Sequence, residues 1–147
     1  MRYQIEETVG FALAQVCKTH RYAVDGALRG IDDCELRVGQ EMLLLQLWRE
    51  DGVTQSQLGE CLMVEPPTVT KMLQRLEGKG MVERRSDPGD ARISRVFLTA
   101  RGRALEQEVA ATWRVVEEQA TAGMSVEERL LLRRLLVQMR QNLCQHS

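Results

Sequence analysis

The chain has 147 residues, enough for one domain with a substantial core and too few for two independent cores. Apolar residues make up 44% and charged residues 28%, with only three prolines and no low-complexity tract, which excludes a disordered or fibrous chain. The formal net charge is −1, yet residues 71–103 hold nine basic and four acidic residues and carry +5, which leaves −6 on the rest. Such a basic segment indicates either a surface for a polyanion or an ordinary solvated surface, and charge alone does not decide between them.

Neither a targeting segment nor a disulfide framework is indicated. The first ten residues, MRYQIEETVG, contain acids where a signal peptide needs an apolar stretch, and the longest apolar run, MLLLQLW, is too short to cross a bilayer. We therefore expect a cytoplasmic protein. The cysteines lack CxxC spacing, so reduced thiols are expected at Cys17, Cys34, Cys61 and Cys144.

The first third of the chain reads as two helices. Apolar residues at near-helical spacing predict a helix within residues 4–28, followed by a linker over residues 30–38. The run VGQEMLLLQLWRE, residues 38–50, is apolar over a wide face and predicts a buried helix that ends at Asp51-Gly52.

Two short helices follow, each with its own start signal. Thr54 and Gln57 have the spacing of a capping box, in which the two side chains satisfy free backbone N–H groups at a helix start. Pro66 and Pro67 mark the second start, because the first helical turn does not need the N–H groups that proline lacks. This second helix is predicted to bury Val69, Met72, Leu73 and Leu76 and to stop at Gly78 and Gly80.

A β-hairpin is predicted next. The stretches MVERR and ISRVFL are rich in strand-forming residues and flank a polar seven-residue tip, SDPGDAR, residues 86–92. Thr99 is then expected to cap a long helix that reaches about Ala122. The order helix, helix, basic hairpin is that of a winged helix-turn-helix.

The expected ligand of this unit is double-stranded DNA. The second short helix places polar and basic side chains on its outer face, where they can bond to base edges and phosphates, and its N-terminus is expected to attract a phosphate oxygen. The candidate contacts of this helix are Pro66, Pro67, Thr68, Thr70, Lys71, Gln74 and Arg75. The first helix adds Thr54, Gln55 and Gln57.

The hairpin tip has a predicted division of roles. Arg92 is the candidate probe of the minor groove, whose negative potential attracts arginine. Asp90 is expected to hold the Arg92 guanidinium by a charge-assisted hydrogen bond. We expect phosphate contacts or intramolecular partners, rather than base readout, from Arg84, Arg85 and Arg95.

The C-terminal helix carries more apolar surface than one small domain needs. Ser125 and Glu128 form a second capping box, and leucines recur along the helix behind it. With the N-terminal helix it is predicted to form a dimer interface from residues 1–30 and 101–147. The alternative is that the terminal helices pack on the core of their own chain.

The run from Thr54 to Gly102 resembles the winged helix-turn-helix of the MarR family of bacterial transcriptional regulators. The resemblance rests on PTVTKMLQRLEGKGMVER, on the DxR pattern of Asp90 and Arg92, and on the LTxxG pattern of Leu98 to Gly102. It implies a mainly α fold with a small β-hairpin wing, in which residues 38–100 bind DNA within a single unit spanning residues 1–147. Where the family has a doubled basic residue at the wing tip, this chain has Ala91, so one phosphate contact is missing.

The resemblance also implies a mode of regulation. It predicts a homodimer, commonly a repressor, that leaves a pseudo-palindromic operator when a small phenolic or lipophilic ligand, or an oxidant, binds or reacts. We expect the ligand pocket to be lined by Phe11, Tyr22, Met42 and Trp48, or by Trp113, although each could equally be a core residue.

Two other functions compete with ligand control. Cys17 lies on the first helix beside Lys18 and Arg21, which favours a thiol-based redox sensor, although a cysteine on an apolar helix is more often inert. In the hydroperoxide-sensing subgroup the reactive cysteine comes just before Phe-Ala-Leu, where this chain has Gly10. A winged-helix protein-interaction module is the remaining alternative. Two histidines, His20 and His146, and no catalytic or metal-binding motif indicate neither an enzyme nor a cofactor or metal site.

Overall fold

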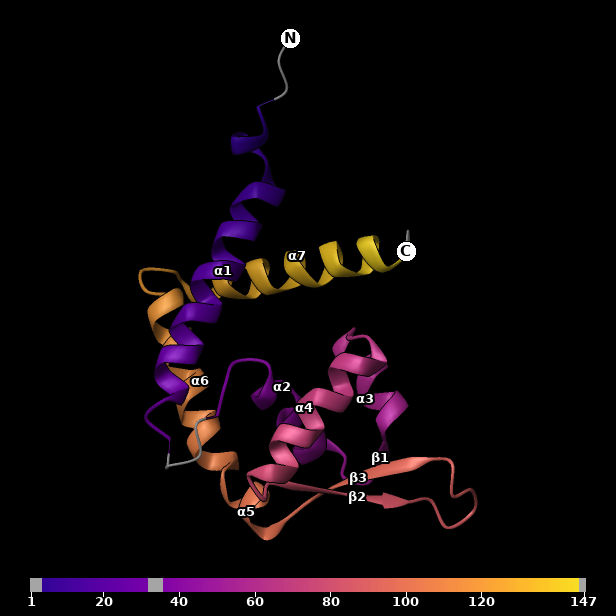
Figure 1. Ribbon diagram of the computed structural model, residues 1–147. Helices are drawn as coiled ribbons and strands as arrows, with labels where there is room; N and C mark the ends of the chain where they lie inside the picture. The colour runs from indigo at the N-terminus through magenta and orange to yellow at the C-terminus, as the bar shows by residue number, and fades with distance from the viewer. Residues whose placement is uncertain (1–3, 32–35, 146–147) are drawn as a thin grey trace.

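A computed structural model describes residues 4–31 and 36–145 as a winged lobe joined to a helical arm (Figure 1). Cys34 and His146 lie outside the described residues. The elements run in the order η1 (Ile5–Glu7), α1 (Val9–Leu28), α2 (Gln40–Arg49), β1 (Val53–Thr54), α3 (Gln55–Leu62), α4 (Pro66–Gly78), β2 (Val82–Ser86), β3 (Ser94–Leu98), α5 (Ala100–Ala104), α6 (Glu106–Ala120) and α7 (Val126–Cys144). The mainly α fold with a small β wing is therefore confirmed.

The winged lobe is built from α2, α3, α4 and a three-stranded antiparallel sheet of order β1-β3-β2. Both capping boxes are present, at Thr54 with Gln57 and at Ser125 with Glu128. The short strand β1 was not predicted, because two residues are too few to show the alternation of apolar and polar side chains that marks a strand. Val53 pairs with Val96, so β1 joins the start of α3 to the wing strand β3.

Two predicted helix boundaries differ from the structure. Thr8, which accepts a hydrogen bond from the Phe11 N–H, caps α1, so the first helix begins later than expected. The helix expected from Thr99 to Ala122 breaks at Leu105 into α5 and α6. At this break the chain passes from the sheet into the arm, and Leu105 itself is buried in the core.

The hairpin tip is shifted by one residue. Ser86 pairs with Ser94 at the end of the ladder, so the connecting segment runs from 87 to 93 rather than from 86 to 92. The Asp87 N–H donates to Ile93 O at 2.8 Å and closes the loop.

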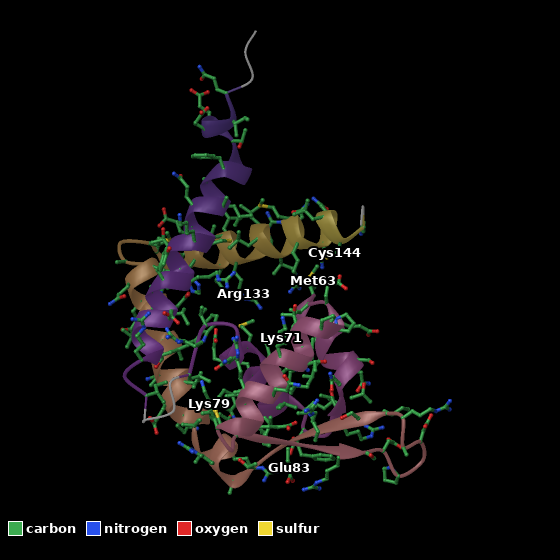
Figure 2. All side chains as sticks on the ribbon, viewed as in Figure 1. Met63, Lys71, Lys79, Glu83, Arg133 and Cys144 are labelled. Carbon is green, nitrogen blue, oxygen red and sulfur yellow. The ribbon has the colours of Figure 1, made fainter. Side chains whose placement is uncertain are left out.

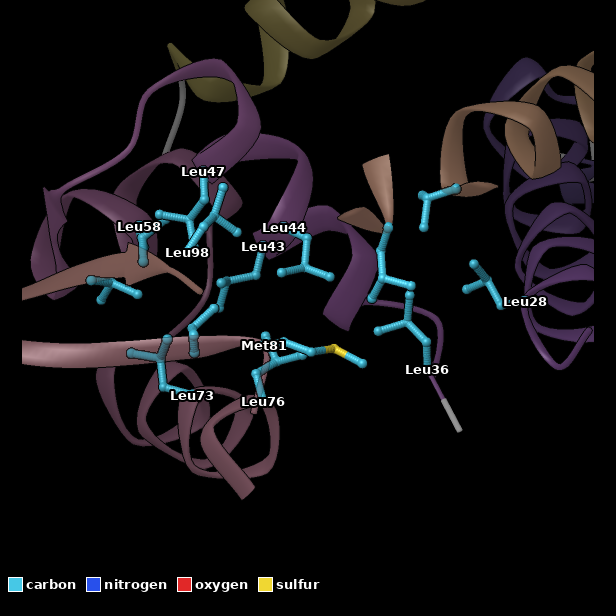
Figure 3. Packing of buried hydrophobic residues seen from close by; sticks show 14 of the residues in the cluster. Leu28, Leu36, Leu43, Leu44, Leu47, Leu58, Leu73, Leu76, Met81 and Leu98 are labelled. Atoms are coloured by element: carbon cyan, nitrogen blue, oxygen red, sulfur yellow. The ribbon is translucent and has the colours of Figure 1, made fainter. Parts of the chain in front are cut away.

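One continuous core holds the lobe together and reaches into the arm (Figure 3). Leucines of α2 meet leucines of α3 and α4 over the sheet, and Leu28 of α1 extends this core with Leu36. Helix α1 packs along α6 to form the arm. Burying a leucine side chain contributes about 2 kcal/mol, so the lobe and the base of the arm stabilise each other.

Helix α7 runs across the arm and contributes no buried residue to this core. Its apolar side chains are exposed, at Val126, Leu130, Leu131, Leu132, Leu135, Leu136 and Leu143. On α1, Val9 and Val16 are more than half exposed. Within the single chain, α7 therefore adds no buried residue to the core, and its role as a dimer interface stays a prediction. Over the described residues, none of the helices has an apolar stretch long enough to cross a membrane.

Candidate nucleic-acid interface

The helix-turn-helix is made by α3 and α4, which are locked together at their N-terminal ends. Gln55 Nε2 donates to Thr70 Oγ1 at 2.8 Å, and Thr70 Oγ1 donates to Pro66 O at 3.0 Å. Thr54 and Gln57 are occupied in the capping box, where the Thr54 N–H donates to Gln57 Oε1 at 2.8 Å. Of the three residues predicted to contact DNA from α3, Gln55 thus makes a tertiary contact and the other two define where the helix begins.

The N-terminus of α4 does not offer the phosphate site that was expected there. Pro66 and Pro67 have no N–H, and the N–H groups of Thr68 and Val69 both donate to Glu65 O, at 3.0 and 3.1 Å. The donors that a phosphate oxygen needs are therefore absent or already used. This expectation was wrong because the proline pair that starts the helix also removes its anion-binding groups.

The outer face of α4 is free for a partner. Four of its predicted contact residues are exposed, and within residues 4–31 and 36–145 their side chains make no hydrogen bond or ion pair: Thr68, Lys71, Gln74 and Arg75. Lys71 lies midway along the helix (Figure 2). Thr70 differs from these four, because it is half-buried at the contact with α3.

The wing tip holds one arginine outward. Arg92 Nε donates to Asp90 Oδ1 at 3.1 Å and Nη2 donates to Oδ2 at 3.2 Å, while the Arg92 side chain stays 91% exposed. The Arg92 N–H also donates to Asp90 Oδ1, and the guanidinium and this N–H together lower the pKa of Asp90. The structure thus contains the predicted ion pair between these two residues.

The three arginines on the wing strands have partners within the chain. Arg84 pairs with Glu77 at the end of α4, and Arg85 pairs with Glu83 while its guanidinium lies 4.6 Å from the centre of the Phe97 ring. Arg95 pairs with Asp87, whose pKa is lowered mainly by that hydrogen bond, and donates to Gly52 O at 3.0 Å. Arg84 thus braces the hairpin against α4 and Arg95 braces it against the turn before β1, whereas the contacts of Arg85 stay within the hairpin.

Sequence reasoning missed the residue that anchors the base of the wing. Asp51 Oδ1 accepts from the Leu98 N–H at 2.9 Å and from the Gly52 N–H at 3.0 Å, and Asp51 Oδ2 pairs with Arg103 at 2.9 Å. One carboxylate therefore joins the turn after α2, strand β3 and helix α5. The Asp-Gly turn was read only as a helix stop, and nothing local to it predicts these distant partners.

A groove of about 790 Å³ brings the helix-turn-helix and the wing together. Gln55 and Pro66 line it from the helices and Arg92 from the wing tip, and two acids, Glu60 and Glu65, also face it. The groove is therefore formed by α3, the N-terminal end of α4 and the wing, whereas the four exposed side chains of α4 lie outside its lining.

The predicted ligand pocket is not formed as expected. A cavity of about 600 Å³ lies against the C-terminal half of α1 and is lined by Cys17, Lys18, Arg21, Tyr22, Asp25, Arg37 and Val38. Of the five residues named as candidates for its lining, including Trp113, only Tyr22 lines this cavity. Trp48 Nε1 instead donates to Gly102 O at 2.9 Å and fastens α2 to α5, and Met42 is exposed on α2.

Comparisons with known proteins agree with this geometry. Residues 36–94 match the family model described as the MarR family. The chain is 40% identical over 102 residues to an uncharacterized HTH-type transcriptional regulator, YdgJ, of Bacillus subtilis, covering 69% of this chain and 62% of the relative. It is 36% identical over 109 residues to the HTH-type transcriptional regulator TtmR of Methylorubrum extorquens, covering 74% of this chain and 55% of that protein. The chain thus spans less than two thirds of the length of either relative.

Among solved structures, the fold matches a mutant of MarR from E. coli complexed with operator DNA. The TM-score is 0.83 at 26% identity, and the match covers 94% of this chain and 99% of that one. The shared fold includes both the winged lobe and the helical arm. This chain therefore carries the winged helix-turn-helix domain of the MarR family, within the fold of that family's regulators.

Proposed function

We propose that the chain is a DNA-binding transcriptional regulator that acts as a homodimer on a pseudo-palindromic operator. The observation that carries the proposal is a helix-turn-helix whose second helix, α4, exposes polar and basic side chains, next in the chain to a wing whose tip holds Arg92 outward. Amide and basic groups on a helix suit base edges and phosphates in the major groove, and an extended arginine suits the minor groove. A relative of the same fold is complexed with operator DNA, which supports this assignment.

Dimerisation is proposed from the exposed apolar side chains of α7 and α1. Leu130 and Leu143 are each 65% exposed, and five further apolar side chains of α7 are exposed as well. Exposed apolar side chains in such number mark an interface, and a two-fold dimer would place two recognition helices in successive major grooves, about 34 Å apart.

The effector is proposed to enter the cavity along α1. Lys18, Arg21 and Arg37 surround one carboxylate there, Asp25, whose pKa is lowered mainly by its hydrogen bond from Arg29. Tyr22 adds an aromatic face. A small phenolic ligand that carries a negative charge would suit this lining, and its release of DNA would make the protein a repressor.

A second candidate, redox control through Cys17, has one favourable observation. Cys17 is exposed and lines the same cavity as Lys18 and Arg21. Positive charge near a thiol favours the reactive thiolate. A protein-interaction module has no such support, because the exposed face of α4 is polar and basic rather than apolar.

The test is a gel-shift titration of the purified protein on its own upstream DNA at several salt concentrations, with and without salicylate or peroxide. DNA binding through phosphate contacts should weaken steeply as salt rises, through counterion release. Salicylate should release the parent and a Cys17→Ser variant alike, whereas redox control predicts that peroxide releases only the parent. Binding to no DNA, or binding unaffected by salt, would reject the proposal.

A further inference from the structure

A hydrogen bond between Gln55 and Thr70 fixes the orientation of the Gln55 side-chain amide at the start of α3. Gln55 is the first residue of α3, and Thr70 lies one turn into α4, so the bond ties the DNA-facing ends of the two helices together. Both side chains are half-buried, which sets them apart from the exposed residues farther along α4.

The direction of the two bonds follows from a count of hydrogens. A threonine hydroxyl has one hydrogen, and that of Thr70 is donated to Pro66 O at 3.0 Å. Toward Gln55 the hydroxyl can therefore only accept, so the carboxamide turns its NH₂ group to Thr70, and Nε2 lies 2.8 Å from Oγ1. The orientation of the Gln55 amide is thus imposed by Thr70 and Pro66.

This arrangement leaves half of the amide unused. Within residues 4–31 and 36–145, Gln55 Oε1 accepts no hydrogen bond. One of the two Nε2 hydrogens is donated to Thr70, and the other has no acceptor there. Gln55 also lines the groove that Arg92 closes from the wing. A donor and an acceptor held side by side at this groove match the N7 and N6 groups of adenine in the major groove. A phosphate offers acceptors only and would leave the carbonyl without a partner.

We propose that Gln55 reads an adenine in each half-site and that Thr70 is the positioning residue that holds its amide in the reading orientation. The inference rests on the proposed function, because it assigns a base preference to the same DNA-binding surface. It also changes the role of Thr70, from a residue that contacts DNA itself to one that acts through Gln55.

The test combines site selection with a double-mutant cycle on the full-length protein. The parent is used to enrich a pool of randomised DNA duplexes, and the enriched duplex then serves for affinity measurements with Gln55→Ala, Thr70→Val, Thr70→Ser and the double variant Gln55→Ala/Thr70→Val. Thr70→Val keeps the shape of the side chain and removes the hydroxyl, and Thr70→Ser keeps the hydroxyl. Thermal unfolding of each variant shows that it is folded.

Gln55→Ala is expected to lose about tenfold in affinity and to lose the preference for adenine at one position of each half-site, within the range of a bidentate base contact. Thr70→Val should lose affinity and the same preference, Thr70→Ser should stay within about twofold of the parent, and the double variant should bind as Gln55→Ala does, because the two residues act as a unit.

Three results would overturn the inference while leaving the proposed function intact. These are an unchanged adenine preference in Gln55→Ala, equal losses in Thr70→Ser and Thr70→Val, or a double variant whose loss is the product of the two single losses. A uniform loss across all sequences in Gln55→Ala would assign the amide to a phosphate instead. If the parent enriches no sequence at all, both the inference and the proposed function fail.

Discussion

Asp90 holds Arg92 by two hydrogen bonds of 3.1 and 3.2 Å while the arginine side chain remains 91% exposed at the tip of the wing. An exposed ion pair adds little to folding stability. The ion pair limits the directions in which the guanidinium can point. Arg92 therefore loses less side-chain conformational entropy when it enters a DNA groove.

Removing either partner should therefore affect DNA binding far more than folding. We expect Arg92→Ala to weaken DNA binding about tenfold at physiological salt and Asp90→Ala to weaken it less, because the guanidinium is then present but unrestrained. Titration of labelled DNA at fixed salt gives the affinities, and thermal unfolding should change little in either variant. Arg85→Ala is the matched control, since Arg85 is also paired with an acid but lies on strand β2 rather than at the tip. An affinity loss in that control equal to the loss in Arg92→Ala would contradict a special role for the tip.

Gly102 packs closer to neighbouring backbone than any other glycine in the part of the chain that the structure describes. A Cβ atom added at this position would lie 2.1 Å from Met81 O, which is a backbone atom that cannot move aside. We expect Gly102→Ala to lower the free energy of unfolding by about 3 kcal/mol, because α5 must shift away from the Met81 backbone just before β2. Gly78→Ala is the control: nothing lies within 4 Å of its Cβ, and the loss of a helical glycine should stabilise the protein slightly. Urea unfolding of both variants measures the difference, and two equal values would contradict the contact.

Glu41 is a buried carboxyl group at the start of α2. It is 1% exposed, its Oε2 has no partner among the described residues, and burial raises its pKa above the usual range. A raised pKa in the folded state means that the contribution of Glu41 to stability is fully present below its unfolded pKa and is lost as the pH rises through the folded value.

Glu41→Gln should remove this loss. Relative to the parent, the variant should become more stable by about 1 kcal/mol on going from acid to neutral pH. Chemical unfolding at several pH values measures this, with the exposed Glu118→Gln as the control. The comparison must be made with the parent at each pH, because the lowered pKa values of Asp25, Asp87 and Asp90 make the folded state lose stability as the pH falls. A difference between Glu41→Gln and the parent that does not vary with pH would show that the carboxyl group stays ionised.

The apolar surface of α7 should decide the oligomeric state. Leu135 is 41% exposed and lies on the apolar side of the helix, so Leu135→Asp should weaken a dimer that buries this face without disturbing the core of the chain. Sedimentation velocity over a range of concentrations should show dissociation of the variant at concentrations where the parent is a dimer. Arg133→Asp, on the side of the same helix opposite Leu135, should remain a dimer. A parent that is monomeric at every concentration would contradict the interface.

Local signals in the sequence predicted most of the fold. Three helix starts depend only on neighbours at most three residues away: the capping boxes at Thr54 and Ser125 and the proline pair of α4. Contacts over so short a distance can be predicted from the spacing of residues in the sequence. The order of two short helices and a basic hairpin indicated the winged helix, and the DxR pattern indicated the pair of Asp90 with Arg92. These statements needed no knowledge of what packs against what.

Which polar side chains remain free for DNA depends on how the elements pack against one another. Asp51 joins β3 to α5 through a hydrogen bond and an ion pair. Thr70 accepts a hydrogen bond from Gln55, and Arg84 and Arg95 form ion pairs with acids elsewhere in the lobe. Local patterns in the chain predicted most of the helices, the two wing strands, the charge of the basic segment and the arginine at the wing tip, but neither β1 nor the break between α5 and α6. The partners of the other polar groups lie 7 to 52 residues away along the chain, so they are set by how the elements pack and not by local spacing.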